Sequence, residues 1–338
     1  MPSEKFLKAQ VGLQSAHGAA VTPTIQWPGT ANAEDARTRY EAPYDAGAWT
    51  PTTIICDTAY LTSLVTAGLG FYEILPIYLN AGLEDVAPTG AGPYTHTYII
   101  SPAAVAVPMP TTWLVGAVGT NLGATGPAIK LKDLYLSDLT LTGNMNDKTI
   151  NHSGTWFGTT FDDNAGAGYA FAAVGLPATL HSMRFLHGAL NIDDAGKTGG
   201  AFTTMTAFTC TLMDWSWKLI TGIAPRYCGD SASLSMAGIK YTTPAITMDI
   251  AARLSNTYYA LMVAKYTAAA YQELQLIVTD GTDTLTINMT GRWTAMQALR
   301  RADNEVVMQG TFTCQTPYYQ VITPHYCVIT NVSTQNWT

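Results

Sequence analysis

The sequence predicts a mainly β protein made of two β-sandwich or partial-barrel units, each with a short flanking helix. Apolar and polar residues alternate over many short segments, turn residues separate these segments, and one irregular strand pattern occurs twice. A length of 338 residues also exceeds the usual size of a single core. We therefore expect an N-terminal arm and a first unit in residues 1–180, and a second unit in residues 181–338.

The segment Leu131–Gly143 shows the irregular pattern most clearly. Its apolar residues alternate with polar ones up to Leu136 and resume the alternation at Leu139, so the phase changes at Ser137 and Asp138. A shift of one residue moves side chains to the opposite face of a sheet. The apolar residues therefore stay on one face only if an extra residue bulges out of the strand here.

The segment Cys210–Leu219 shows the same skip beside Asp214. We expect the two segments to be corresponding strands, one in each unit. Asp138 and Asp214 are candidates for carboxylates that face a lumen or stabilise the bulges. Hydrogen bonding within a turn explains these two aspartates equally well.

A mixed-charge, turn-rich segment at residues 32–45 predicts a projecting loop or hairpin in a chain that is otherwise poor in charge. Its charged residues form a candidate arm between subunits or between rings, and a solvated connection is an equally good interpretation. The candidate arm residues are Glu34, Asp35, Arg37, Arg39 and Glu41.

Two segments favour helices, one near residues 57–83 and one near residues 256–267. In the first, Asp57 is placed to cap a helix whose apolar side chains form one stripe. In the second, Ser255 or Asn256 is the expected cap.

The other apolar stretches predict strands. The clearest is a hairpin over residues 274–289, in which Asp280 and Gly281 supply the turn. Further strands are predicted at residues 24–27, 52–56, 94–100, 111–118, 149–158, 202–220, 231–239, 245–251, 306–314 and 319–329.

Composition excludes several classes of protein. The formal net charge of −7 argues against a protein that binds nucleic acid by neutralising phosphates, although DNA could still slide along such a surface. The five cysteines are odd in number and form no C-x-x-C pair, which indicates reduced thiols. No apolar run predicts a signal peptide or a membrane-spanning helix.

No pattern in the sequence predicts catalysis, a cofactor or a bound metal. Residues Asn191–Thr198 resemble the end of a phosphate-binding loop, but asparagine stands at its first position and two aspartates would repel phosphates. His181 and His187 are six residues apart, a spacing that does not suit a helical zinc site. The acidic turns near Asp162 and Asp280 lack the continuation of a calcium-binding loop.

Three segments carry a resemblance to a known family, namely Val11–Thr24 (VGLQSAHGAAVTPT), Leu131–Gly158 and Phe208–Tyr318. Together they resemble the tail tube, or major tail, proteins of long-tailed bacteriophages. The first is similar to that family's habitual opening of a glycine, a glutamine or glutamate and a second glycine before a Thr-Pro strand entry. The likeness is one of pattern and covers most of the chain.

This resemblance implies a structural virion protein and not an enzyme. Inner strands would join those of neighbouring subunits around a lumen, and stacked rings would form a tail tube through which DNA is ejected. The two units suit a trimer with pseudo-six-fold symmetry, and hexameric rings remain the alternative. The implied partners are further copies of the chain, a tape-measure protein, tail terminator and distal tail proteins, and DNA in transient, non-specific passage.

The resemblance also implies a location in the virion tail after synthesis in the host cytoplasm, without membrane insertion and without a cofactor. A second hypothesis is a carbohydrate- or receptor-binding β protein of a virion or cell surface, because Trp215, Trp217, Trp293 and the tyrosines could stack on sugars. Aromatic residues at strand spacing more often belong to a core. An enzyme such as a glycoside hydrolase is a third hypothesis, and no pair of carboxylates stands out for it.

Overall fold

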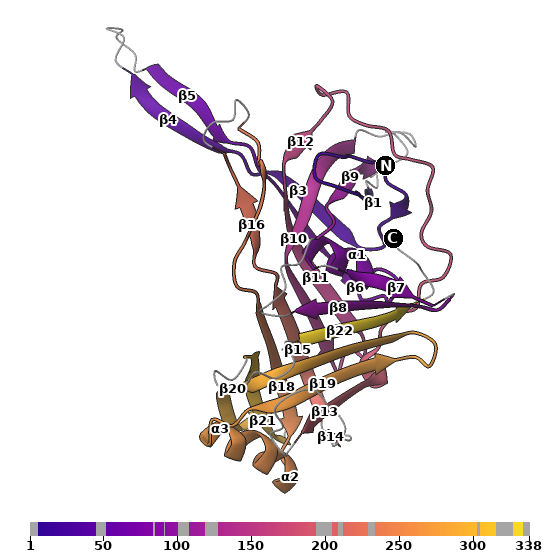
Figure 1. Cartoon of the computed structure of the whole chain (residues 1–338), viewed down its shortest axis with the longest axis vertical. Helices are drawn as coiled ribbons and strands as arrows, with labels where there is room; N and C mark the ends of the chain where they lie inside the picture. Colours follow the sequence, from indigo (N-terminus) through magenta and orange to yellow (C-terminus); the bar gives the residue numbers. More distant parts are fainter. Residues whose placement is uncertain are drawn as a thin grey trace, which may run out of the picture.

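The computed structural model describes residues 6–44, 52–83, 85–90, 92–100, 108–118, 128–193, 205–208, 212–228, 234–302, 305–315 and 327–333. Strands dominate these residues, as predicted, and helices are few and short. Figure 1 shows an elongated body of strands from which the hairpin β4–β5 projects at one end, while α2 and α3 lie at the other.

The elements of the first half lie within residues 6–162. In chain order they are β1 (Phe6–Leu13), β2 (Ile25–Gln26), β3 (Thr30–Asp35), β4 (Thr38–Tyr44), β5 (Thr52–Ala59), β6 (Thr62–Leu69), α1 (Leu75–Gly82), β7 (Asp85–Thr89), β8 (Tyr94–Ile100), β9 (Thr111–Val118), β10 (Ala128–Asn144), β11 (Ile150–Gly158) and β12 (Thr160–Asp162).

The elements of the second half lie within residues 185–333. In chain order they are η1 (Phe185–His187), β13 (Gly188–Asp193), β14 (Met205–Ala207), β15 (Leu212–Ile220), β16 (Ile223–Arg226), β17 (Gly238–Tyr241), β18 (Ala245–Arg253), α2 (Asn256–Tyr259), the π-helical turn η2 (Ala260–Ala264), α3 (Lys265–Thr267), β19 (Gln272–Thr279), β20 (Thr284–Ala302), β21 (Glu305–Cys314) and β22 (Cys327–Ser333).

The strand pairings of the first half are repeated in the second. An inner series β3–β6–β11–β10 corresponds to β15–β18–β21–β20. An outer series β2–β1–β9–β10–β12 corresponds to β14–β13–β19–β20–β22. In each half a helical segment follows the second inner strand, and one long strand, β10 or β20, takes part in both series.

The two inner series are joined into one antiparallel sheet, because the C-terminal half of β10 pairs with β15. The order of this eight-stranded sheet is β3–β6–β11–β10–β15–β18–β21–β20. No series of pairings among the described strands returns to the strand where it began, so the sheet is open. Its two edges are β3 and the C-terminal half of β20.

Both bulges expected from the sequence are present. The register between β10 and β11 shifts between Leu136 and Asp138, which makes Ser137 the extra residue. The register between β15 and β18 shifts between Leu212 and Asp214. Because of these bulges, the apolar side chains on both sides of each skip stay on the buried face of the sheet.

The expected correspondence between Leu131–Gly143 and Cys210–Leu219 is wrong. β10 and β15 hold the described parts of these segments, since Cys210 lies outside the described residues. The two strands are antiparallel neighbours in one sheet and occupy different places in their series. The counterpart of β10 is β20, which bulges at Thr294, between Trp293 and Ala295. A phase skip in a sequence identifies a bulge, but it carries no information about where the strand lies in the sheet.

The helix expected near residues 57–83 is also mostly wrong, because only Leu75–Gly82 is helical and β5 and β6 precede it. Thr62, Leu64 and Thr66 are all fully buried at a spacing of two, so the period of a strand prevails. The second helical segment is confirmed at residues 256–267, where the Ser255 hydroxyl accepts a hydrogen bond from the Tyr258 backbone N–H at 3.2 Å.

Of the other predicted strands, some are confirmed and some are wrong. Those at 94–100 and 111–118 and the hairpin turned by Asp280 and Gly281 are confirmed. The long strand at 202–220 is wrong as a single element, because β14 and β15 are separate. Within 231–239, residues 231–233 lie outside the described residues, and of the remainder only the end is a strand, since β17 starts at Gly238. Most of 319–329 also lies outside the described residues.

One hydrophobic core runs through both halves. Its largest fully buried side chains include those of Trp113 and Trp156 from the first half and Trp217 and Phe312 from the second. Strand β8 of the first half also pairs with β22 of the second, so the halves share backbone hydrogen bonds in two places. The halves are therefore fused side by side and do not form independent cores.

Candidate assembly interface

The open edges of the inner sheet are the first candidate site. A sheet edge presents unpaired backbone N–H and C=O groups that can pair with another chain. Here one edge, β3, is the counterpart of β15, and the other, the C-terminal half of β20, is the counterpart of β10. The two edges are thus the equivalents of two strands that already pair with each other inside the chain.

The face of the inner sheet that points away from the core is polar and carries little charge. Along β10 it presents Asp138, Thr140 and Thr142, and along β15 it presents Asp214 and Lys218. Charged side chains on this face of the eight strands are five carboxylates and three cations, a net charge of −2 among the described side chains. They are Glu34, Asp138, Asp214, Asp249, Glu305, Lys218, Arg253 and Arg292.

Both aspartates singled out in the sequence lie beside bulges on this face. Asp138 is half-buried and accepts hydrogen bonds from the hydroxyl groups of Ser137 at 2.9 Å and Thr155 at 3.2 Å. Asp214 is exposed and lies opposite Asn144 in the pairing of β10 with β15. The two carboxylates are at opposite ends of that pairing, so they do not form one site.

Thr294 is the position that sequence reasoning missed. It is the bulge residue of β20, and its hydroxyl donates to the Thr311 carbonyl at 3.4 Å, as the Ser137 hydroxyl donates to the Thr155 carbonyl at 3.1 Å. The partner strands supply a sequence signal for this equivalence. Gly-Thr-Trp at 154–156 corresponds to Gly-Thr-Phe at 310–312, one short motif in each half.

A projecting hairpin lies between the first two inner strands of each half. In the first half it is β4–β5, and in the second it is β16–β17. Figure 1 shows β4–β5 extending well beyond the body of strands, with β16 rising beside its base. The hairpin expected at residues 32–45 is confirmed only in part, because residues 32–35 lie in β3 of the inner sheet, β4 supplies one strand of the hairpin, and Asp45 lies outside the described residues.

The five candidate arm residues are spread along this hairpin and its base. Glu34 and Asp35 end β3, Arg37 follows in the turn, and Arg39 and Glu41 are on β4.

Arg37 holds the base of the arm. The Arg37 Nε donates to the Asp35 carboxylate at 2.6 Å, and the guanidinium lies 5.4 Å from the centre of the Tyr60 ring. The hydrogen bond from Arg37 keeps the pKa of Asp35 below its ordinary value, against the opposing effect of burial. The Tyr60 backbone N–H donates to the Leu234 carbonyl at 2.9 Å, which ties β5 to the β16–β17 connection.

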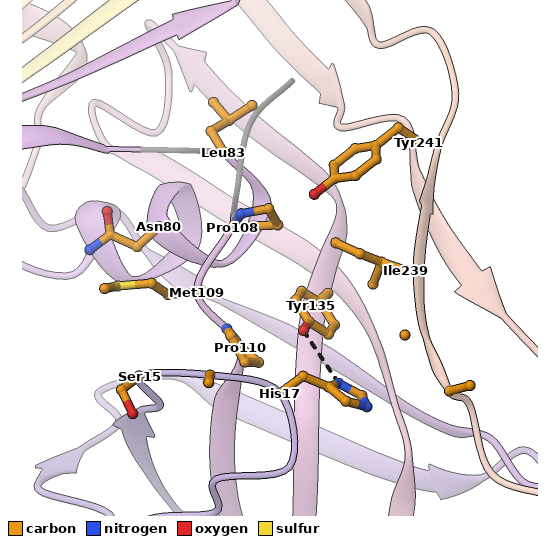
Figure 2. A pocket seen from close by; sticks show the side chains of 13 residues that line it. Ser15, His17, Asn80, Leu83, Pro108, Met109, Pro110, Tyr135, Ile239 and Tyr241 are labelled. Atoms are coloured by element: carbon orange, nitrogen blue, oxygen red, sulfur yellow. Dashed lines mark hydrogen bonds between the residues drawn. The ribbon is translucent and has the colours of Figure 1, made fainter. Parts of the chain in front are cut away.

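A cavity of about 570 Å³ lies where the halves meet, beside the β16–β17 hairpin. Figure 2 shows it between the loop after β1, the end of α1, β10 and β17. The His17 ring and the Tyr135 hydroxyl are joined by a hydrogen bond of 3.4 Å. Its described lining is mostly apolar. The labelled lining residues are Ser15, His17, Asn80, Leu83, Pro108, Met109, Pro110, Tyr135, Ile239 and Tyr241.

The three tryptophans behind the carbohydrate hypothesis are buried. Trp215, Trp217 and Trp293 are only 2%, 1% and 2% exposed. Their rings belong to the core and cannot stack on a sugar. Large apolar side chains are instead exposed near the open β20 edge, at Leu254 and Val306, whose backbones are joined by a hydrogen bond.

One of the weaker sequence patterns has a plain structural explanation, and a second lies mostly outside the described residues. The turn at 280–283 is closed by the Asp280 carboxylate, which accepts from the backbone N–H groups of Thr282 at 2.9 Å and Asp283 at 2.8 Å. The segment that resembles a phosphate-binding loop begins inside β13, and its remainder from residue 194 lies outside the described residues.

Comparison with models of known protein families and with curated proteins finds no match to this chain. Among the residues that the structure describes, no helix is both long enough and apolar enough to cross a membrane. The features of the molecule that indicate a function are therefore the sheet edges, the polar face and the projecting hairpins.

Proposed function

We propose that the chain is a structural subunit that closes into rings around a lumen and stacks into a tube, of the kind that forms the tail of a long-tailed bacteriophage. The observation that carries the proposal is the internal joint between β10 and β15. It joins the two inner series of the chain. The open edge at β3 is equivalent to the β15 side of this joint, and the open edge at β20 is equivalent to the β10 side. The same pairing can therefore recur between chains, with β20 of one copy against β3 of the next.

The internal joint also gives the register of the proposed contact. Thr140, three residues after the bulge at Ser137, lies opposite Lys218. Gln297 is likewise three residues after the bulge at Thr294.

The position equivalent to Lys218 is Glu34. The residues across from them, Thr247 and Ser63, occupy equivalent positions on β18 and β6. Gln297 of one copy is therefore expected opposite Glu34 of the next.

If the β10–β15 joint is repeated between chains, a closed ring is favoured over an open assembly, because every sheet edge left free in a monomer becomes paired. Three copies would bring 3 × 8 = 24 inner strands around the lumen. We prefer a trimer with pseudo-six-fold symmetry, because each chain already holds two equivalent series of inner strands, and a hexamer is the alternative.

The polar face of the inner sheet would line the lumen. Its described side chains carry both signs with a small negative excess, and hydroxyl and amide groups fill most other positions. DNA binds tightly where clustered cations release its counterions, so this face would let DNA pass without holding it. A tape-measure protein would occupy the lumen before DNA does, and terminator and distal tail proteins would contact the ends of the tube.

The projecting hairpins would connect successive rings. Both leave the body between the first and second inner strands, so each ring of three chains would present six of them, alternately β4–β5 and β16–β17. The longer β4–β5 hairpin is the better candidate for the contact, since it extends farthest from the body (Figure 1).

Electron microscopy of the purified protein tests the proposal. The expected result is rings or stacked tubes with an open channel, and class averages with three-fold symmetry and six similar lobes. Six chains per ring would retain the tube function and reject the preferred symmetry. A protein that stays monomeric at high concentration, with no rings under any condition, would contradict the proposal.

A further inference from the structure

Three residues from distant parts of the chain meet at one nitrogen atom. The His181 Nδ1 lies 2.8 Å from the Glu73 Oε1 and 2.5 Å from the Asp283 Oδ2. Glu73 precedes α1 in the first half, His181 lies in the segment between the halves, and Asp283 ends the turn before β20. The three donor atoms all lie within 4.8 Å of one another.

Both carboxylates are withdrawn from water. Glu73 and Asp283 are 0% exposed, whereas the His181 side chain is 37% exposed. Two buried carboxylates so close together repel each other, and leaving both ionised is costly unless positive charge is nearby. A single Nδ1–H can point at only one of the two oxygens, so the proton of this imidazole does not serve both carboxylates at once.

We propose that Glu73, His181 and Asp283 form a site for a divalent metal ion of zinc-like chemistry that links the two halves of the chain. One imidazole nitrogen and two carboxylate oxygens are ligands that suit zinc, and a fourth position would be left for water on the exposed side of His181. An ion with two positive charges neutralises both carboxylates at once. It also takes the place of the single proton for which they compete.

The surroundings of the three side chains support a built site. The His181 backbone N–H donates to both oxygens of Glu73, at 3.2 and 3.0 Å, and so fixes the carboxylate. Phe71 and Ser182 form an isolated antiparallel β-bridge, which holds the segment of Glu73 against the segment of His181. Groups that orient metal ligands in this way usually strengthen metal binding.

Two buried polar atoms nearby have no hydrogen-bond partner among the described residues, namely the Tyr72 hydroxyl and the Asn331 Oδ1. Asn331 is anchored beside this cluster because its Nδ2 donates to the Tyr72 carbonyl at 2.7 Å. A water ligand of the ion would give the buried Tyr72 hydroxyl a hydrogen-bond partner.

Zinc titration of the metal-free full-length protein, followed by calorimetry, tests the site. We expect one zinc ion per chain and a higher unfolding temperature with zinc, while Ca²⁺ causes neither effect. The variants Asp283→Asn and His181→Ala should each weaken zinc binding at least about tenfold. His181→Ala changes a partly exposed side chain, so it keeps the test valid if Asp283→Asn does not fold.

The matched control is Asp163→Asn, which removes an exposed carboxylate from the segment that also holds His181. It should bind zinc as the unchanged protein does. Cobalt substitution separates this site from the cysteines, because Co²⁺ held by nitrogen and oxygen gives no thiolate charge-transfer band. Absence of zinc binding, a thiolate band, or equal binding by the His181→Ala variant would overturn the proposal in favour of a hydrogen-bonded His–carboxylate cluster.

Discussion

Ser137 and Thr294 occupy the same place in two copies of one hairpin. Each is the extra residue of a bulge in the long strand of its half. Each donates its hydroxyl to the carbonyl of a threonine on the returning strand, Thr155 or Thr311. This pair fixes the correspondence between β10 and β20, and through it the equivalence of the open sheet edges with the internal joint.

Deleting Ser137 should destabilise the protein far more than replacing it with alanine. Without the extra residue, the part of β10 after the bulge would turn Leu139 and Leu141 outward and bring Thr140 toward the core. Ser137→Ala loses only hydrogen bonds on a half-buried side chain, an expected cost of about 1 kcal/mol. Chemical denaturation of both variants measures the difference, and similar losses for the two would contradict the role of the bulge.

Gly154→Ala should lower the free energy of unfolding by roughly 1–3 kcal/mol, because a new methyl group would overpack the core. A Cβ at Gly154 would lie very close to the Tyr78 ring of α1, which is itself 1% exposed and has no room to move. Gly310→Ala should cost less, since the nearest atom, 2.8 Å away, is the flexible end of Met296. Gly175→Ala is the control, because nothing lies within 4 Å of its Cβ position.

His152 should make the protein less stable in acid. Burial lowers the pKa of His152 from 6.5 to about 4, against a backbone hydrogen bond with Leu69 that raises it. The rings of Trp27 and Tyr78 pack against His152, and neither ring is charged between pH 4 and pH 7. Since the unfolded chain binds the proton more readily, stability falls as the pH drops from about 6.5 to about 4 and changes no further below that.

The expected loss from this one residue is at most about 3 kcal/mol, from a shift of roughly 2.5 pKa units. Denaturation curves between pH 4 and pH 7 measure it, and the variant His152→Phe should show a smaller dependence on pH. An unchanged pH dependence in that variant would assign the acid sensitivity to other groups.

Arg37→Ala should leave the isolated chain almost as stable as before. Its partner Asp35 and its own side chain are both partly exposed, and ion pairs of that kind contribute about 0–1 kcal/mol. If the hairpin connects rings, the same change at the base of the arm should shorten or abolish tubes while single rings persist. Sedimentation and electron microscopy distinguish the two outcomes, and normal tubes would remove Arg37 from the stacking contact.

The local features of the fold could be predicted from the sequence because they depend on neighbouring residues. The alternation around Ser137 indicates a bulge, Asp280-Gly281 indicates a turn, and Ser255 indicates a helix start. The apolar spacing around Leu64 failed as a helix signal, because a short apolar run fits both periods.

Relationships between distant segments could not be predicted in the same way. Two skips that looked alike belong to neighbouring strands, whereas the true counterpart of Ser137 lies in a strand with different side chains. The meeting of Glu73, His181 and Asp283 depends on the packing of three separate segments, and no spacing in the sequence signals it. Both relationships are products of the tertiary fold.

The most direct test of the proposed assembly is a cross-link between Gln297→Cys and Glu34→Cys in the same chain. Residues directly opposite each other in an antiparallel pair are close enough for a disulfide bond. Thr140→Cys with Lys218→Cys is the matched control and should form the same bond within one chain. Mild oxidation should link the test variant between chains into a ladder that ends at the trimer, while the protein with only its native cysteines gives no ladder. Exclusively monomeric products, obtained while the control pair does cross-link, would contradict the claim that the internal joint is repeated between copies.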